Sequence, residues 1–363
     1  FYYALTQVQN FKERSNDDKM MIKFSKGEFE YPVRFLEENV VHFGKQLNGD
    51  DFNSVQYLSC GTTSLIYTAK VWNNEEVVVK MLKHNLPRNN IADEEIATEI
   101  AILSRTRHPN IVEFKGAGKS LRKFLSVEYL KGGTLDHFLS SHISRCHQLL
   151  PLARVISISR DIASALKYLH DDFHYEASVI HRDLKPQNIG FTADGRVKLF
   201  DFGLATCVKK RVCTAEVYEM TGYTGTLAYM APEVALHQPY SEKVDIYSFG
   251  MILWQMLSGE EPFLDICKAD YLQQVVLGGQ RPPIPQFPSF RDVKDWNCER
   301  EQLQWKGLVQ LVQQCWDPEP NCRPSASALQ TSLELIFSGK PLQRQPAIAP
   351  LFTDNWRSCP IIM

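Results

Sequence analysis

The sequence predicts an α+β fold with two lobes: a small antiparallel β-sheet that carries one helix, followed by a mainly helical lobe. Two observations indicate this order. Residues 54–129 contain short runs of β-branched and aromatic residues separated by turn residues, which is typical of short strands. After the Lys-Gly-Gly sequence at 131–133, apolar residues recur every three to four positions, as in helices that bury one face. The length of 363 residues accommodates such a unit or two separate domains.

The first lobe is expected to hold five strands, with one helix between the third and the fourth. Ile96, Ile100 and Leu103 indicate the helix, because they recur at helical spacing after the capping residues Asn89 and Asn90. The predicted strands are 55–58, 65–72, 76–82, 111–115 and 124–129, with a hairpin turn at 73–74.

Two long helices are expected in the second lobe. Apolar positions within 155–169 form one stripe, which predicts an amphipathic helix, whereas 244–257 is apolar nearly all round, which predicts a buried helix. Residues 1–53 are interpreted as an N-terminal extension without an assigned role. Residues 339–363 contain four prolines and little periodicity, so we expect a loosely attached tail.

Composition excludes several classes of protein. The formal net charge of −2 argues against binding nucleic acid by bulk electrostatics. Nine cysteines without a C-x-x-C pair indicate reduced thiols, and the richest apolar run, 247–257, is too short for membrane insertion. A cytoplasmic location is therefore expected, with the nucleus as an alternative. Because the chain starts at Phe1 instead of Met, a fragment of a longer protein is one interpretation.

One stretch carries the chemistry, Val-Ile-His-Arg-Asp-Leu-Lys-Pro-Gln-Asn at 179–188, followed by Asp-Phe-Gly at 201–203. Asp183 and Lys185 alternate along the backbone and point to one region, while Asn188 and Asp201 offer oxygen ligands. Phosphoryl transfer needs such a set: a carboxylate to orient a hydroxyl, a cation on the phosphoryl group and ligands for Mg²⁺. Any three of these residues alone would fit a charged surface loop, but the full order and spacing favour phosphoryl transfer.

The string resembles the eukaryotic protein kinases, whose motifs read H-R-D-L-x-x-x-N and D-F-G. The resemblance covers about 54–338 and implies the two-lobed kinase fold, with an N-lobe at 54–130 that carries helix C and a C-lobe at 131–338. It implies ATP and Mg²⁺, or alternatively Mn²⁺, as cofactors, and a protein as the phosphate acceptor. Lys185 and residues 225–233 match Ser/Thr kinases, whereas 248–254 and 315–317 look tyrosine-kinase-like. The combination resembles the tyrosine-kinase-like group of Ser/Thr kinases.

The resemblance also implies catalytic roles. Asp183 and Lys185 would act at the transferred group, Asn188 and Asp201 would hold the metal, and Lys80 would hold the α- and β-phosphates. Glu99 would pair with Lys80 when its helix is swung in. Alternatively, Lys80 is a solvated strand end and Glu99 faces solvent, as Glu94 and Glu95 are expected to do.

The nucleotide site departs from the family in two places. The phosphate loop, normally G-x-G-x-x-G-x-V, keeps only Gly61, which predicts weakened but real binding; by itself this segment would be an ordinary turn. In the base slot, Val78 stands where Ala is usual and Gly190 where Leu commonly forms the floor. We expect a base slot of altered shape that is still flat, with part of its floor supplied by neighbouring residues. The alternative is poor base binding. The other nucleotide-site residues implied are Ser59, Ser64, Ile66, the gatekeeper Val127, and Glu128 and Leu130 in the hinge.

The remaining implied roles are regulatory and structural. Thr221 and Thr224 are candidate phosphosites in an activation loop, with Arg182 as the cation that pairs with a phosphate. Glu233 and Arg323 should form a buried ion pair. Cys207 and Cys213 flank a basic run at 209–211, which would lower their thiol pKa. Architectural roles fall to Thr226 beside the catalytic residues, to Asp245 as the anchor of the loop backbone, and to His181, Phe202, Leu103 and Phe114 in the regulatory spine.

Two classes of function remain open from the sequence. An active Ser/Thr kinase is favoured because every residue that carries chemistry is present. A pseudokinase that acts as a scaffold or allosteric partner is the alternative, motivated by Ser59, Ser64, Val78 and Gly190. Thr134 and Gln187 stand where basic-directed kinases carry acids, which argues against an Arg-directed substrate preference. Substrate, activator and oligomeric state stay unassigned.

Overall fold

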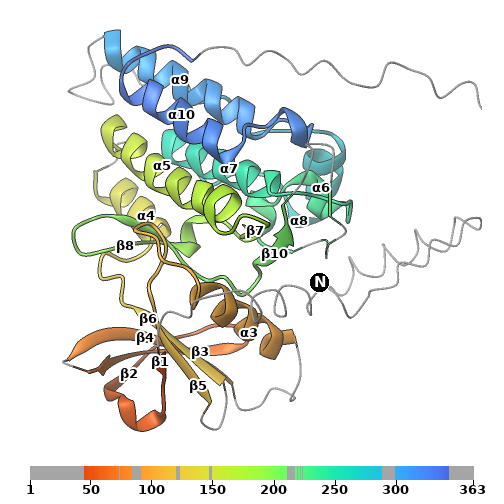
Figure 1. The fold of residues 1–363 in the computed structure, drawn as a ribbon. Helices are drawn as coiled ribbons and strands as arrows, with labels where there is room; N and C mark the ends of the chain where they lie inside the picture. Colours follow the sequence, from red (N-terminus) through yellow and green to blue (C-terminus); the bar gives the residue numbers. More distant parts are fainter. Residues whose placement is uncertain are drawn as a thin grey trace, which may run out of the picture.

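The computed structural model describes residues 45–72, 74–83, 91–119, 123–146, 149–210, 217–218, 220, 222, 224–287 and 299–342. The chain folds into two lobes, a β-sheet lobe below and a helical lobe above in Figure 1. The predicted two-lobed α+β fold is confirmed.

The sheet lobe contains six strands in the order β1-β5-β6-β4-β3-β2. Five of them pair antiparallel, as predicted, and β1 adds a parallel pair with β5. The strands are β1 (Lys45–Gln46), β2 (Asn53–Cys60), β3 (Ser64–Val71), β4 (Glu75–Leu82), β5 (Phe114–Lys119) and β6 (Lys123–Glu128), with a 3₁₀ turn at Gly49–Asp51.

Two details of the sheet differ from the prediction. The sheet begins at Lys45, before Ser54, and Leu47 behind it is only 1% exposed. The fourth expected strand, 111–115, is shifted: β5 starts at Phe114, and Ile111 forms a bridge with Leu199 instead. The predicted hairpin residue Asn73 lies outside the described residues.

Helix α3 (Ile91–Leu103) packs on the sheet and carries the predicted apolar stripe, with Ile96 and Leu103 buried. The capping residues expected at Asn89 and Asn90 lie outside the described part of the chain. Glu99 is buried on the same helix, so a charged residue faces inward from an otherwise apolar face. This placement brings α3 into the site between the lobes.

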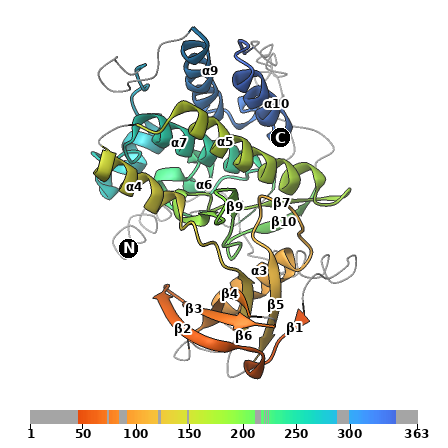
Figure 2. The same ribbon diagram turned by 90° about the vertical axis from the view of Figure 1, so that its left-hand side faces the viewer.

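The helical lobe is built around α7 (Lys243–Ser258), whose residues from Lys243 to Leu257 are all buried. The helices α5 (Leu152–Lys167) and α9 (Glu299–Cys315) both pack against it (Figure 2). The predicted helix at 155–169 is α5, which a π-helical turn, Tyr168–Asp172, extends. The other segments are α4 (Leu135–Cys146), α6 (Pro232–Ala235), α8 (Lys268–Tyr271), a π-helix at Leu272–Leu277 and α10 (Ala326–Phe337).

Two short β-ladders in the helical lobe position the loops that face the sheet. β7 (Ala177–Ile180) pairs with β10 (Thr206–Lys209), and β8 (Ile189–Phe191) pairs with β9 (Val197–Leu199). The loop at 181–188 joins β7 to β8, and 200–205 joins β9 to β10, so the two motif segments lie side by side. None of the described helices combines the length and the apolarity needed to cross a bilayer.

Candidate active site

The catalytic-loop residues form one hydrogen-bonded group. Lys185 Nζ donates to Asp183 Oδ2 at 2.7 Å and to Thr226 Oγ1 at 2.8 Å. Thr226 Oγ1 in turn donates to Asp183 Oδ1 at 3.1 Å. Asn188 Nδ2 donates to the carbonyl and the carboxylate of Asp183, at 2.9 and 3.0 Å. The Asp183 carboxylate is therefore held from three sides by residues of two segments.

Asp245 at the start of α7 holds the backbone of this loop. Its carboxylate accepts from the N–H of His181 at 2.8 Å and of Arg182 at 2.9 Å, and His170 Nε2 lies 2.8 Å away. Burial alone would raise the pKa of Asp245, but the hydrogen bond with His170 and the other contacts outweigh it, so this pKa is lowered. Arg182 and Asp201 have φ of +65° and +63°, a conformation that costs energy for residues other than glycine. The contact of Arg182 N–H with Asp245 and that of Asp201 with Lys80 hold it.

Lys80 joins the two lobes through two carboxylates. Its Nζ lies 2.7 Å from Glu99 Oε2 and 2.7 Å from Asp201 Oδ1. Phe202 N–H donates to the second oxygen of Glu99 at 3.2 Å, which ties α3 to the Asp-Phe-Gly turn. Burial by itself would lower the pKa of Lys80, but Glu99 and Asp201 together raise it. The ammonium therefore stays charged, and α3 lies in the swung-in position.

Glu95 does not face solvent, so the prediction for this residue is wrong. Glu94 is exposed, but Glu95 is half-buried, one helical turn before Glu99 and on the same side of α3. A Cβ at Gly203 would lie 3.8 Å from the Glu95 Cβ. Burial raises the pKa of Glu95, against the opposing effect of Lys80. The i, i+4 spacing from Glu99 was the available signal in the sequence.

Asn188 and Asp201 fit a divalent cation by their donor atoms. Asn188 directs Nδ2 at Asp183, so its side-chain oxygen is the atom it can offer. The Asp201 side chain is 42% exposed, and Oδ1 is the oxygen that bonds Lys80. Mg²⁺ is commonly held by one or two protein oxygens together with phosphate oxygens and water. The two residues suit that pattern.

The phosphate-loop hairpin forms although two of its three glycine positions hold serine. Gly61 N–H donates to Ser64 O at 2.9 Å, which closes the turn between β2 and β3. Ser64 is buried at 5% exposure, whereas Ser59 is exposed and pairs with Ile66. Lys83 Nζ donates to the carbonyl of Thr62 at 3.0 Å and places a cation near the loop tip.

In the expected base slot, Val78 pairs with the gatekeeper Val127 across β4 and β6. The position left empty by Gly190 is covered: a Cβ there would lie 2.4 Å from Leu130 Cδ1 and 3.3 Å from Phe200 Cε1. Phe200 had no role in the sequence analysis. Its place immediately before Asp201 was the only signal.

A family model for the protein kinase domain matches residues 52–333, well over half of the chain. The chain belongs to the protein kinase family. Among its relatives are two from Arabidopsis thaliana, the serine/threonine-protein kinase VIK, 34% identical over 79% of this chain, and the serine/threonine/tyrosine-protein kinase HT1, 31% identical over 82%. The probable serine/threonine-protein kinase gdt4 of Dictyostelium discoideum is 31% identical over 79%. The chain spans 60% of the length of VIK, 72% of HT1 and 16% of gdt4.

Protein kinases use ATP and a divalent cation. The four residues expected in the regulatory spine, His181, Phe202, Leu103 and Phe114, are all buried. The rings of His181 and Phe202 lie 4.8 Å apart. Leu103 and Phe114 are buried in the same core cluster. His181 Nε2 also lies 3.3 Å from the carbonyl of Phe200, so this ring contacts the backbone immediately before Asp201.

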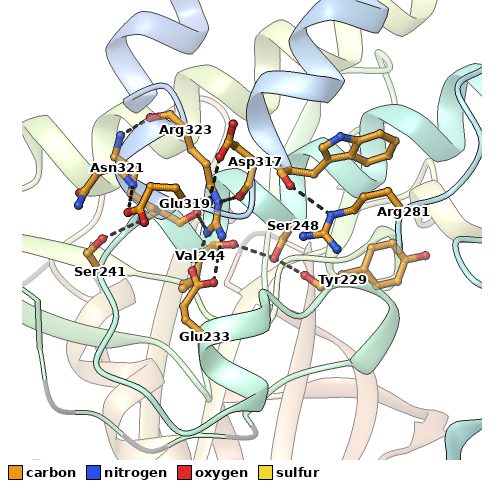
Figure 3. Close-up of polar contacts among 12 residues, drawn as sticks. Tyr229, Glu233, Ser241, Val244, Ser248, Arg281, Asp317, Glu319, Asn321 and Arg323 are labelled. Carbon is orange, nitrogen blue, oxygen red and sulfur yellow. Dashed lines mark hydrogen bonds and ion pairs between the residues drawn. The ribbon is translucent and has the colours of Figure 1, made fainter. Parts of the chain in front are cut away.

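The buried ion pair expected between Glu233 and Arg323 is present (Figure 3). Both terminal nitrogens of Arg323, Nη1 and Nη2, donate to the Glu233 carboxylate, at 2.6 and 3.0 Å. Its Nε donates to the carbonyl of Asp317 at 2.9 Å. The guanidinium also lies 5.1 Å from the centroid of the Tyr247 ring. Removing one partner of such a pair typically costs about 3–5 kcal/mol.

Two expectations for the activation loop, the phosphosites and the lowered thiol pKa, have different outcomes; Cys213 lies outside the described residues. Thr221 lies outside the described residues, while Thr224 Oγ1 donates to the carbonyl of Gly222 at 3.4 Å. The guanidinium of Arg182 donates to the carbonyl of Leu204 and to the Tyr240 hydroxyl. The low thiol pKa expected for Cys207 is wrong: the residue is 1% exposed in β10, and burial raises its pKa to about 12.

Proposed function

We propose that this chain is an active protein kinase that transfers the γ-phosphoryl group of ATP to serine and threonine hydroxyls. The observation that supports this most is Lys185 Nζ bridging the Asp183 carboxylate and Thr226, which holds the carboxylate where an acceptor hydroxyl could meet it. The intact contact between Lys80 and Glu99 supports it further. VIK and gdt4 are named serine/threonine kinases, while the name of HT1 includes tyrosine.

The proposed transfer assigns one task to each side chain. An Asp183 oxygen accepts a hydrogen bond from the acceptor hydroxyl and takes its proton as the hydroxyl oxygen bonds to the γ-phosphorus. The bond from that phosphorus to the bridging oxygen breaks, and ADP leaves. Lys185 keeps positive charge beside the transferred group, and Lys80 holds the remaining phosphates. A divalent cation, for which we propose Mg²⁺ over Mn²⁺ at Asn188 and Asp201, neutralises phosphate charge when bound.

A pseudokinase scaffold is the second candidate, because the phosphate loop and the base slot depart from the family. Two contacts weaken it. The Gly61–Ser64 hydrogen bond closes the phosphate loop despite Ser59 and Ser64, and Leu130 covers the hollow at Gly190. The phosphate loop and position 190 thus have local compensation, and the catalytic positions are unchanged.

Further proposals concern the rest of the chain and its partners. We propose a kinase domain at 54–338, flanked by an extension at 1–53 and a tail at 339–363, and a cytoplasmic or nuclear location. Thr221 and Thr224 are proposed activation-loop phosphosites. The substrate is a protein without a strong requirement for arginine, since Thr134 and Gln187 are neutral. The amide of Gln187 donates to Asp136 Oδ1 at 2.6 Å, so one carboxylate does lie beside it.

The test measures transfer of labelled phosphate from Mg-ATP to peptide libraries with Ser, Thr or Tyr acceptors. Asp183→Asn should lower the rate by about 10²–10⁴-fold, because general-base contributions are of that size. A melting temperature close to that of the wild type would show that the variant is folded. Equal transfer by both proteins would contradict an active site at Asp183. Transfer to tyrosine alone would contradict the proposed acceptor.

A further inference from the structure

Lys83, the residue after β4, holds two successive carbonyl groups of the phosphate loop. Its backbone N–H donates to the carbonyl of Thr63 at 3.0 Å, and its Nζ donates to the carbonyl of Thr62, also at 3.0 Å. Within the turn itself, Gly61 N–H donates to the carbonyl of Ser64 at 2.9 Å. The turn between β2 and β3 is therefore held from the end of β4 as well as by its own backbone.

The side chain of Lys83 lies on the face of the sheet that is turned away from Lys80. Side chains along a strand alternate between the two faces, so Lys80 and Leu82 share one face of β4. Met81 and Lys83 share the other. The packing agrees, because Leu82 belongs to the core cluster that contains Ile96 of α3, whereas Met81 packs on a separate cluster behind the sheet.

Peptide planarity converts the contact of Lys83 into an orientation of the next N–H group. In a trans peptide, the C=O of one residue and the N–H of the following residue point in opposite directions. Because the carbonyl of Thr62 is drawn toward Lys83, the N–H of Thr63 is turned to the face that carries Lys80. Thr62 is exposed and Thr63 is half-buried, so this part of the loop is open to a ligand.

We propose that Lys83 is a positioning residue that turns the N–H of Thr63 toward the phosphates of ATP. The inference rests on the proposed kinase function and deepens it, because it names how a loop with Ser59 and Ser64 in place of glycines still offers a backbone donor to phosphate. Lys83 acts through the backbone of 62–63 and touches no reacting atom. Its removal should therefore change nucleotide affinity far more than the rate of transfer.

The test compares Lys83→Met with the wild type by calorimetry and steady-state kinetics on the full chain. Methionine keeps the length of the side chain but removes the donor and the charge. We expect Mg-ATP to bind about three- to tenfold more weakly, which is the effect of losing one hydrogen bond. The KM for ATP should rise by the same factor while kcat falls by less than about twofold. Adenosine, which has no phosphate, should bind both proteins equally.

Three comparisons separate orientation from charge and from unfolding. Lys83→Arg keeps a long cationic donor and should return the affinity to within about twofold of the wild type. Lys70→Met removes a lysine at the other end of the β3–β4 pair, opposite Glu76, and should change neither the affinity nor the KM for ATP. The effect of Lys83→Met should persist at about 1 M salt, where an effect of charge alone is largely screened.

NMR gives a direct readout of the N–H of Thr63. In the wild type, its proton resonance should shift when Mg-ATP is added and stay in place when adenosine is added. In Lys83→Met, the shift at saturating Mg-ATP should be much smaller. A loss of fold stability alone would not produce this difference, because both proteins are compared in the folded, nucleotide-bound state.

The outcomes separate this inference from the proposed function. If the wild type binds and uses ATP but Lys83→Met has wild-type affinity, the positioning role is wrong and the kinase proposal stands. A loss of affinity that vanishes at high salt, or a Thr63 resonance that does not respond to Mg-ATP, would also overturn the positioning role. If the wild type binds no ATP, the proposed function and the positioning role both fall.

Discussion

Asp245 shows how much a single buried carboxylate contributes at the scale of one residue. It receives two backbone N–H groups from 181 and 182 and a contact from His170, so the catalytic loop depends on one side chain of α7. Asparagine can offer only one oxygen to these three partners. Loss of the carboxylate would therefore leave a buried N–H without its acceptor.

We expect Asp245→Asn to lower the free energy of unfolding by about 2–4 kcal/mol. The pKa of Asp245 is lowered in the folded protein, so its contribution is complete above the unfolded value near pH 4 and is lost as pH falls through the folded value. The difference between wild type and variant should thus stay constant from about pH 5 to 8 and shrink only in acid. Urea unfolding at several pH values measures it. A difference that changes near pH 7 would contradict the assignment.

At this scale, the sequence could predict residues whose roles depend on spacing along the chain. Asp183, Lys185 and Asn188 lie within one loop, so their order alone indicated their proximity. Glu95 and Phe200 were missed, because which face of a helix or strand end turns inward depends on packing with distant segments. The pKa of Cys207 was misjudged for the same reason, since burial raises it and outweighs the opposing charge of Arg105.

At the scale of elements, the contact between α7 and α9 depends on Gly250. A Cβ at this position would lie 2.7 Å from the Cys315 Cβ and 3.5 Å from Trp316 N. The two helices can therefore approach only because one of them lacks a side chain at the crossing.

Gly250→Ala should destabilise the protein by about 1–3 kcal/mol through overpacking. Alanine is intrinsically better than glycine inside a helix by about 1 kcal/mol, so any loss of stability reports the contact with α9. Chemical denaturation is the measurement, and Gly49→Ala, which meets no neighbour, is the control. A variant as stable as the wild type would show that α9 moves without cost.

Elements with a strong apolar pattern were predictable, and those defined by pairing were not. The all-round apolar sequence of 244–257 indicated a buried helix, and α7 is one. β1 has only two residues and is specified by its register with β5, which no local pattern reveals. Helices α4 and α9 carry many polar residues, so the sequence indicated a mainly helical lobe without locating them individually.

At the scale of the molecule, the two lobes are joined beside the hinge by an ion pair. Glu128 at the end of β6 accepts from Lys198 Nζ in β9 and from the N–H of Glu113 at 2.7 Å. The side chains of Glu128 and Lys198 are only 19% and 12% exposed. The pair therefore limits how the sheet lobe can tilt over the helical lobe.

Lys198→Met should loosen the lobes, lower the free energy of unfolding by about 1 kcal/mol and raise the KM for ATP several-fold. Faster hydrogen exchange at 127–134 is the direct readout. The matched control is Lys131→Met, which breaks an exposed pair with Glu76 at the same hinge. It should change neither the KM for ATP nor the rate of hydrogen exchange at 127–134. Equal exchange in both variants would show that the buried pair does not restrain the hinge.

The charges around Lys80 bear on how ligands arrive. The region contains two ammonium groups, those of Lys80 and Lys185. It also contains four carboxylates, those of Asp183, Asp201, Glu95 and Glu99. A bare triphosphate approaching them would meet more negative than positive charge, whereas a triphosphate that already carries a divalent cation would not. The electrostatics of the site thus favour an order of binding in which nucleotide and cation enter as one complex.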